Sequence, residues 1–166
     1  MTIPNAQTVS QPGANPIDLA NSPEVRTFKM RIPLVEKGSY RLPLASTENA
    51  ALLLRVYAPH GGENAMHAHH NQDHSFIVLQ GQARFTTGRN GVSLLSKNEG
   101  IMIPAGGYYC FENAGEEPLV VLRIGIWCGE GDPAVRLGVH GEQIDPHTPA
   151  NNRPLDVVFI EGQFFE

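Results

Sequence analysis

From Thr27 onward the chain alternates between short apolar runs and turn residues. Ten such runs stand out, at residues 27–35, 39–44, 51–58, 74–80, 83–87, 92–96, 100–105, 108–113, 119–127 and 155–161. Glycine, proline or asparagine lies near most of the boundaries, as at Gly38, Gly81 and Gly115. Regularly spaced strands with turn signals between them are typical of a sandwich or barrel. The pattern therefore predicts an all-β fold with few or no helices.

The segments between these runs add detail to this prediction. Asn90-Gly91 predicts a hairpin, because this pair accepts the positive φ angles of a primed turn. Only residues 22–26 and 132–136 offer a short helix, each with a capping residue followed by proline. Residues 129–154 are polar and contain proline, so we expect an irregular crossing before the last strand.

Length and charge narrow the class of protein. Residues 1–24 are polar and rich in proline, asparagine and glutamine, which predicts a loose arm, and residues 25–166 suit a single domain. The net charge is −5 and the twelve lysines and arginines are scattered, so no nucleic-acid partner is expected. No run reaches the roughly 18 apolar residues of a membrane span. The beginning of the chain does not resemble a signal peptide, so we expect a cytoplasmic location and no membrane partner.

Four of the seven histidines lie within eight residues, His67 to His74. Side chains at i and i+2 on a strand share a face about 6.6 Å apart, so His67 and His69 can converge on one ion. His74 has an odd offset from them. A straight strand would instead pair it with His70, whereas a bend in the turn-prone residues 70–73 would bring it back. The spacing alone leaves metal binding and an ordinary polar loop both open.

The residues around this cluster resemble the first motif of the cupin superfamily. In that motif a glycine precedes His-x-His, and a glutamate and a second glycine follow. Here the matching positions are Gly61, His67, His69, His74 and Gly81.

Residues 98–113 resemble the second cupin motif, with Pro104, Gly106 and Asn113 in place. The likeness covers about residues 50–127 and implies a double-stranded β-helix, which is a small jelly-roll barrel. Asn98 stands where the family has glycine, and asparagine tolerates the same left-handed turn. The remaining departures are His74 in place of the family's glutamate and Tyr109 in place of its histidine.

Carried over position by position, the resemblance implies a metal site formed by His67, His69, His74 and Tyr109. Neutral imidazoles suit Fe, Ni, Zn or Cu, and they leave the full charge of the ion to attract an anionic ligand. Tyr109 is either a direct ligand or a nearby proton donor, and it is our candidate for the catalytic acid or base. Asp73 more naturally orients a histidine or caps the turn.

Four further residues are candidates for contacts with substrate. Arg55 and Arg123 lie within runs that are apolar on both faces. Each either faces the barrel interior, where a guanidinium can hold a carboxylate, or lies outside it. Phe76 and Phe111 would line the wall of the pocket, whether as core or as substrate contacts.

Two classes of function follow from these expectations. The first is a mononuclear metal-dependent enzyme, dioxygenase-like, acting on a small organic acid or ketone. The alternative is a barrel without catalysis, which binds a small ligand or has a structural role. In either case we expect a homodimer, on the strength of the resemblance.

Overall fold

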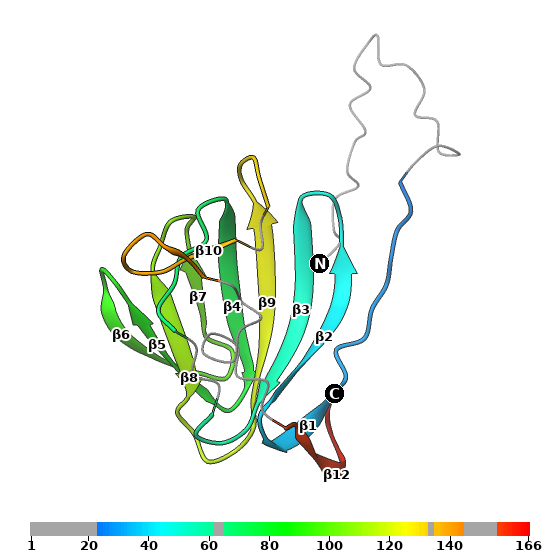
Figure 1. Ribbon diagram of the computed structural model, residues 1–166. Coiled ribbons are helices and arrows are strands. Elements are labelled where there is room, and N and C mark those ends of the chain that lie inside the picture. Colours follow the sequence, from blue (N-terminus) through cyan, green and yellow to red (C-terminus); the bar gives the residue numbers. More distant parts are fainter. Residues whose placement is uncertain (1–22, 62–64, 133–134, 145–155) are drawn as a thin grey trace, which may run out of the picture.

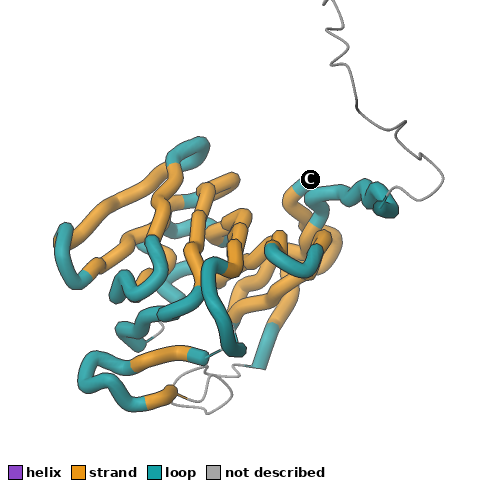
Figure 2. Tube along the Cα trace, turned by 90° about the horizontal axis from the view of Figure 1, so that it is seen from above, coloured by secondary structure: helices purple, strands orange, loops and turns teal. Residues whose placement is uncertain are grey.

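The computed structural model describes residues 23–61, 65–132, 135–144 and 156–166, and in these ranges the chain contains strands and loops but no helix (Figure 2). The main strands are β1 (Ile32–Lys37), β2 (Ser39–Ser46), β3 (Ala50–Tyr57), β4 (Gln72–Gln80), β5 (Gln82–Thr87), β6 (Gly91–Ser96), β7 (Gly100–Ile103), β8 (Tyr109–Asn113), β9 (Leu119–Trp127) and β12 (Val158–Phe165). Two short strands, β10 (Arg136–Leu137) and β11 (Gln143–Ile144), lie between β9 and β12. The all-β prediction is confirmed, and each of the ten expected runs contributes a strand.

Two antiparallel sheets form the barrel. One has the order β2-β3-β9-β4-β7 and the other β6-β5-β8. Figure 1 shows these sheets facing each other, with β1 and β12 paired at one end of β2 and β3. This arrangement of antiparallel strands is the jelly-roll barrel expected from the sequence.

Period-two alternation decides which side chains enter the barrel. In β4 the buried residues are Gln72, His74, Phe76 and Val78, which alternate with partly exposed neighbours. Because successive side chains of a strand point to opposite faces, these four share the inner face of the larger sheet. In β8 the buried positions alternate in the same way and begin at Tyr109. Residues far apart in the sequence are therefore brought to one interior.

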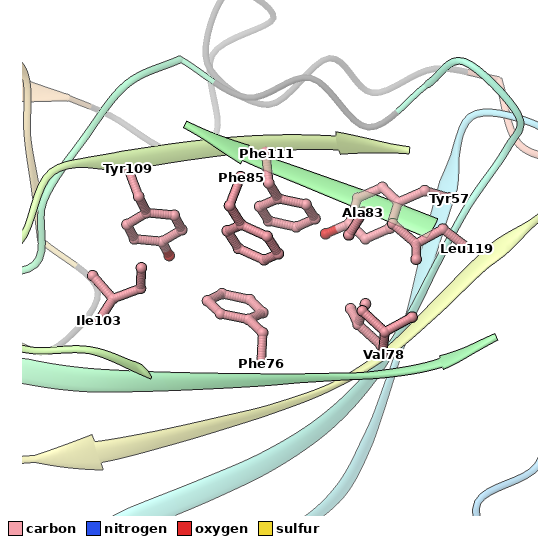
Figure 3. Packing of buried hydrophobic residues seen from close by; sticks show 10 residues of the cluster. Tyr57, Phe76, Val78, Ala83, Phe85, Ile103, Tyr109, Phe111 and Leu119 are labelled. Carbon is pink, nitrogen blue, oxygen red and sulfur yellow. The ribbon is translucent and has the colours of Figure 1, made fainter. Parts of the chain in front are cut away.

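Aromatic side chains fill the space between the sheets. Phe76 reaches from β4 toward Phe85 and Phe111 of the smaller sheet, with ring centroids 5.2 and 5.3 Å away (Figure 3). Tyr109 lies at one end of this cluster, above Phe76 and Ile103. The inner core thus supports the residues at the end of the barrel where His74 and Tyr109 lie.

A second cluster covers the outer face of the larger sheet. Ile32 and Val35 of β1 pack with Leu54, Val56 and Val120, which are the outward-facing residues of β3 and β9. The larger sheet is consequently apolar on both faces.

Two details differ from expectation. At the β5–β6 hairpin, Thr87 pairs with Gly91, and only Gly91 has positive φ, so a loop of residues 88–90 replaces the two-residue primed turn. Neither short helix is present in the described parts of 22–26 and 132–136, and Arg136 instead begins β10. The expected arm lies outside the described residues except for 23 and 24, which have no regular structure. No helix in the described ranges is long and apolar enough to cross a membrane.

Candidate functional site

A turn at His70 and Asn71 brings three histidines together. His67 and His69 precede this turn and His74 follows it on β4, and all three are buried, whereas His70 is exposed. The ring centroids are 5.2 Å apart for His67 and His69, and 4.4 Å apart for His69 and His74. The bend at residues 70–71 therefore places His74 on the same side as His67 and His69. Of the two arrangements that the sequence left open, the bent one is present, and the straight strand that would have paired His74 with His70 is not.

Tyr109 joins this group from the opposite sheet. Its backbone forms two hydrogen bonds with that of His67, and its hydroxyl lies 2.8 Å from Nδ1 of His74. Burial raises the pKa of the Tyr109 phenol to about 12, so the hydroxyl keeps its proton at neutral pH. A protonated phenol can donate a hydrogen bond to an imidazole nitrogen that carries a lone pair.

The second nitrogen of His74 is also engaged. Nε2 lies 2.5 Å from Oε1 of Gln72 and 2.5 Å from Nη2 of Arg123. If Nε2 carries the proton, it donates to Gln72 and Nδ1 accepts from Tyr109. If Nδ1 carries the proton, Nε2 accepts from Arg123. In either tautomer the single lone pair of the neutral ring faces a donor.

Three arginines surround the histidines. Arg123 lies opposite Phe76 in the β9–β4 ladder and so enters the barrel interior, where Arg55 of β3 faces the same side two positions away in the register. Arg136 comes from β10, which is joined to the histidine loop by the Ala68–Leu137 bridge. None of the ion pairs formed among the described residues includes these three arginines. The Nε atoms of Arg55 and Arg136 are buried without a hydrogen-bond partner.

We call this group the interior polar cluster; its members are Arg55, His67, His69, Gln72, His74, Tyr109, Arg123 and Arg136.

The electrostatics of the interior polar cluster favour neutral His67 and His74 beside a charged Arg123. Burial, and secondarily the positive charge of Arg136, Arg123 and Arg55, lowers the pKa of His67 to about 4. The pKa of His74 is lowered further by burial and by Arg123. Burial lowers the pKa of Arg123 to about 10, which still leaves its guanidinium charged at neutral pH. The cluster therefore has a net positive charge.

We tested the arrangement against the predicted metal site. Using His74 as a ligand would require breaking a buried hydrogen bond, and the adjacent Arg123 cation repels a metal ion. Asp73 lies elsewhere and accepts a hydrogen bond from the backbone of Ala105, 2.7 Å away. Among the described residues no three His, Cys, Asp or Glu side chains gather in a way that would hold an ion. As arranged, these residues do not fit a three-histidine metal centre.

The candidate substrate contacts divide into two groups. Arg55 and Arg123 face the interior and belong to the interior polar cluster. Phe76 and Phe111 are 1% and 4% exposed and pack among other aromatic rings, so they belong to the inner core that supports the interior polar cluster.

Two members of the interior polar cluster were not predicted. Gln72 lies two residues before His74, so strand parity alone would have placed it on the same face. Arg136 lies in a polar segment with no periodic pattern, so nothing in the sequence indicated that it would lie beside the histidines. Gly125 makes room for Gln72, because a Cβ there would stand 2.5 Å from the Gln72 Nε2 atom.

Comparison with known proteins bears on the fold. Residues 53–125 match the family model of the cupin domain. The Cnp3 cupin domain of Schizosaccharomyces pombe superposes with a TM-score of 0.50 and 22% identity, over 54% of this chain and 61% of that one. A Klebsiella pneumoniae protein with a double-stranded β-helix domain superposes with a TM-score of 0.50 and 20% identity, over 57% of this chain and 76% of that one. At these identities the likeness concerns the fold alone.

Curated relatives share a higher identity over a shorter stretch. The mannose-1-phosphate guanylyltransferase of Escherichia coli is 38% identical over 81 residues, which are 47% of this chain and 17% of that protein. The corresponding enzyme of Salmonella typhimurium is 37% identical over 81 residues, 47% of this chain and 16% of that protein. The chain thus spans less than a fifth of the length of these relatives.

Proposed function

We propose that the barrel binds a small anionic molecule at the interior polar cluster, in a chain whose residues 53–125 match the family model of the cupin domain. The observation that carries the proposal is Arg123, a half-buried cation that contacts His74 and Gln72 but takes part in none of the ion pairs within the described ranges. A charge withdrawn from water without a counterion is costly. An anionic ligand would supply that counterion.

The donors of the interior polar cluster suit such a ligand. Guanidinium groups bind carboxylates and phosphates through paired N–H donors, and these charge-assisted hydrogen bonds are strong. Arg55, Arg123 and Arg136 are all partly exposed, so they combine buried donor atoms with access from solvent. In the tautomer in which Nδ1 of His74 donates to Tyr109, the phenol proton would be free for a hydrogen bond to an oxygen atom of the ligand.

The names of these relatives suggest which anion to try first. Those enzymes are named for mannose 1-phosphate, which is a phosphorylated sugar. A phosphate carries more charge than a carboxylate, which matches a cluster of three arginines. We therefore propose a phosphorylated sugar as the ligand class, and small carboxylates as the comparison.

A metal-dependent enzyme is the second candidate, and one contact favours it. Nδ1 of His67 lies 2.7 Å from the carbonyl oxygen of Ala65, which leaves Nε2 with the lone pair. Metal-binding histidines are commonly oriented by such a bond. One ion of Fe, Ni, Zn or Cu held by His67 and His69 would act as a Lewis acid on a small organic acid or ketone. His74 would join His67 and His69 as a third ligand only after turning away from Arg123.

Calorimetric titration of protein without a histidine tag tests the proposal. The ligands are mannose 1-phosphate, inorganic phosphate, acetate and unphosphorylated mannose. Phosphorylated ligands should bind and mannose should not. Arg55→Ala should weaken binding by about 10- to 100-fold, since a hydrogen bond to a charged group contributes roughly 1.5–3 kcal/mol.

Arg84→Ala is the matched control, because Arg84 pairs with Glu112 on the exterior and should leave binding unchanged. If none of the anions binds, or if Arg55→Ala and Arg84→Ala behave alike, the proposal is refuted. Binding of acetate in preference to phosphate would keep the anion site and replace the ligand class.

A further inference from the structure

We propose that the ligand of this barrel carries two separated anionic groups, one held by Arg123 and the other by Arg41 together with Arg55. The inference rests on the anion-binding function proposed above and specifies its ligand further, as a sugar with an anionic group at each end. Arg41 lies on β2, the edge strand of the larger sheet, and is exposed to solvent. It thus extends the interior polar cluster toward the outside.

Two observations show that Arg41 faces the same side of the sheet as the cluster. In the β2–β3 ladder Arg41 lies directly opposite Arg55, and opposite residues of an antiparallel pair share a face. Arg55 in turn lies opposite Val121, which belongs to the inner core. The preceding residue, Tyr40, packs edge-on against Phe159 of β12, on the outer face. Alternation along β2 therefore directs Arg41 inward.

Arg55 and Arg123 lean away from each other, which divides the positive charge into two groups. The guanidinium carbon of Arg55 lies 5.2 Å from the centre of the ring of Tyr57, two residues further along β3. A terminal nitrogen of Arg123 lies beside Gly125, two residues further along β9, where an added Cβ would stand 3.5 Å from it. Because β3 and β9 are antiparallel, these are opposite directions along the sheet.

The register of the sheet sets the span between the two groups. Arg41 and Arg123 are two strands apart and offset by two residues, which places their Cα atoms roughly 12 Å apart. A single phosphate is too small to contact both. A hexose with an anionic group at each end is long enough to approach Arg123 with one group and Arg41 with the other.

The balance of charge also favours a second anionic group. Arg41, like the arginines of the interior polar cluster, takes part in none of the ion pairs of the described ranges. Four arginines thus face the interior, and guanidinium groups stay charged at neutral pH. One phosphate supplies a charge of only about −1.5 to −2 at pH 7. Two such groups match the four positive charges.

Calorimetric titration with mannose 1-phosphate and mannose 1,6-bisphosphate tests the inference, because these ligands differ only in the second phosphate. The bisphosphate should bind the wild type about 10- to 100-fold more tightly, as expected for added hydrogen bonds to charged groups. Arg41→Gln should reduce this advantage to no more than about 3-fold and change the affinity for mannose 1-phosphate by no more than about 2-fold. Arg84→Gln removes the same charge from the exterior and should keep the full advantage.

Inorganic pyrophosphate distinguishes the number of charges from their spacing. Its two phosphates share an oxygen and cannot span the two groups of arginines. Arg41→Gln should therefore change the affinity for pyrophosphate by no more than about 2-fold. Because Arg41 is exposed, the variant should keep the native fold, which circular dichroism verifies.

Three results would overturn the inference and leave the anion site in place. They are equal affinity of the wild type for the two sugars, an advantage of the bisphosphate that survives Arg41→Gln, and an equal loss for all three ligands in that variant. An advantage that Arg84→Gln also removes would count against it in the same way. Failure of every one of these anions to bind would instead refute the proposed function itself.

Discussion

The hydroxyl of Tyr109 lies 2.8 Å from Nδ1 of His74, so the two side chains that differ from the glutamate and the histidine of the cupin motifs are hydrogen-bonded to each other. The pair joins β8 to β4 across the barrel interior, and both residues are at most 3% exposed. A buried imidazole needs partners for both nitrogens. These two residues thus supply hydrogen-bond partners for each other, and we treat them as one unit.

Tyr109→Phe should destabilise the fold by about 1–3 kcal/mol, because it leaves a nitrogen of buried His74 without a partner. Urea denaturation measures the loss. Combination with His74→Phe should show a coupling energy of about 0.5–3 kcal/mol, as expected for directly contacting residues. Tyr108→Phe serves as the matched control, since its hydroxyl meets only the Gly138 carbonyl and its loss should be smaller. Strictly additive effects of Tyr109→Phe and His74→Phe would show that the pair is not a unit.

Phe76→Leu should affect stability more than ligand binding. Phe76 is 1% exposed and packs against Phe85 and Phe111, so the smaller side chain should cost about 1–3 kcal/mol, less than full truncation. Phosphate affinity should change by no more than about 2- to 3-fold, because the arginines remain in place. Thermal unfolding and calorimetry on the same samples compare the two effects. A large loss of affinity with unchanged stability would instead make Phe76 a contact of the ligand.

Gly125→Ala should disturb the interior polar cluster without removing any of its side chains. The new Cβ would stand 2.5 Å from Nε2 of Gln72, so the Gln72 side chain must shift, whereas the terminal nitrogen of Arg123, 3.5 Å away, would be in ordinary contact. We expect phosphate binding to weaken by roughly 10-fold, about 1.4 kcal/mol, with little loss of secondary structure. Gly91→Ala is unsuitable as a control because its φ is positive. Gly88→Ala serves well, because a Cβ there would meet Tyr108 at 3.4 Å or more, which is ordinary contact. Equal binding by both variants would argue against a positioning role for Gln72.

Stability should fall as the pH is lowered from about 6.5 to about 4. The pKa of His67 is lowered from 6.5 to about 4 on folding, so in this window the unfolded chain binds a proton that the folded chain does not. The contribution of His67 is constant above pH 7 and below pH 4, and the full loss is roughly 3 kcal/mol. Urea denaturation at a series of pH values measures it.

His67→Asn isolates this contribution, because asparagine cannot take up the proton. The variant should lose less stability than the wild type between pH 6.5 and 4, even if it is less stable at pH 7. Identical slopes for the two proteins in that window would contradict the assignment to His67. Exposed ion pairs such as that of Arg84 and Glu112 are common to both proteins and cancel in the comparison.

Much of the barrel could be predicted from local pattern. Alternation in residues 74–80 and 109–113 placed Phe76 and Phe111 on inner faces, and turn residues separated the strands. The prediction that Asn98 takes a left-handed turn is confirmed by its φ of 69°. These features depend on neighbouring residues only, which a sequence displays directly.

The orientation of Arg55 and Arg123 could not be predicted, and the fold explains why. The outer face of the larger sheet is covered by β1 and β12, so β3 and β9 are apolar on both faces. The alternation of apolar and polar residues therefore cannot show which of their side chains face the barrel interior. Arg136 is placed by backbone hydrogen bonds between Ala68 and Leu137, which any side chains would permit. The positive surroundings of the histidines therefore emerge only from long-range pairing.

The pairing of β1 with β12 has a consequence for how the chain reaches its native state. Ile32 aligns with Phe165, so a strand made early during synthesis on the ribosome receives its partner only when the last strand emerges. Until then β1 has no strand partner to hold it over Leu54, Val56 and Val120. The smallest piece that folds by itself is thus larger than the stretch matching the family. A fragment cut at residues 53 and 125 should be recovered as aggregate.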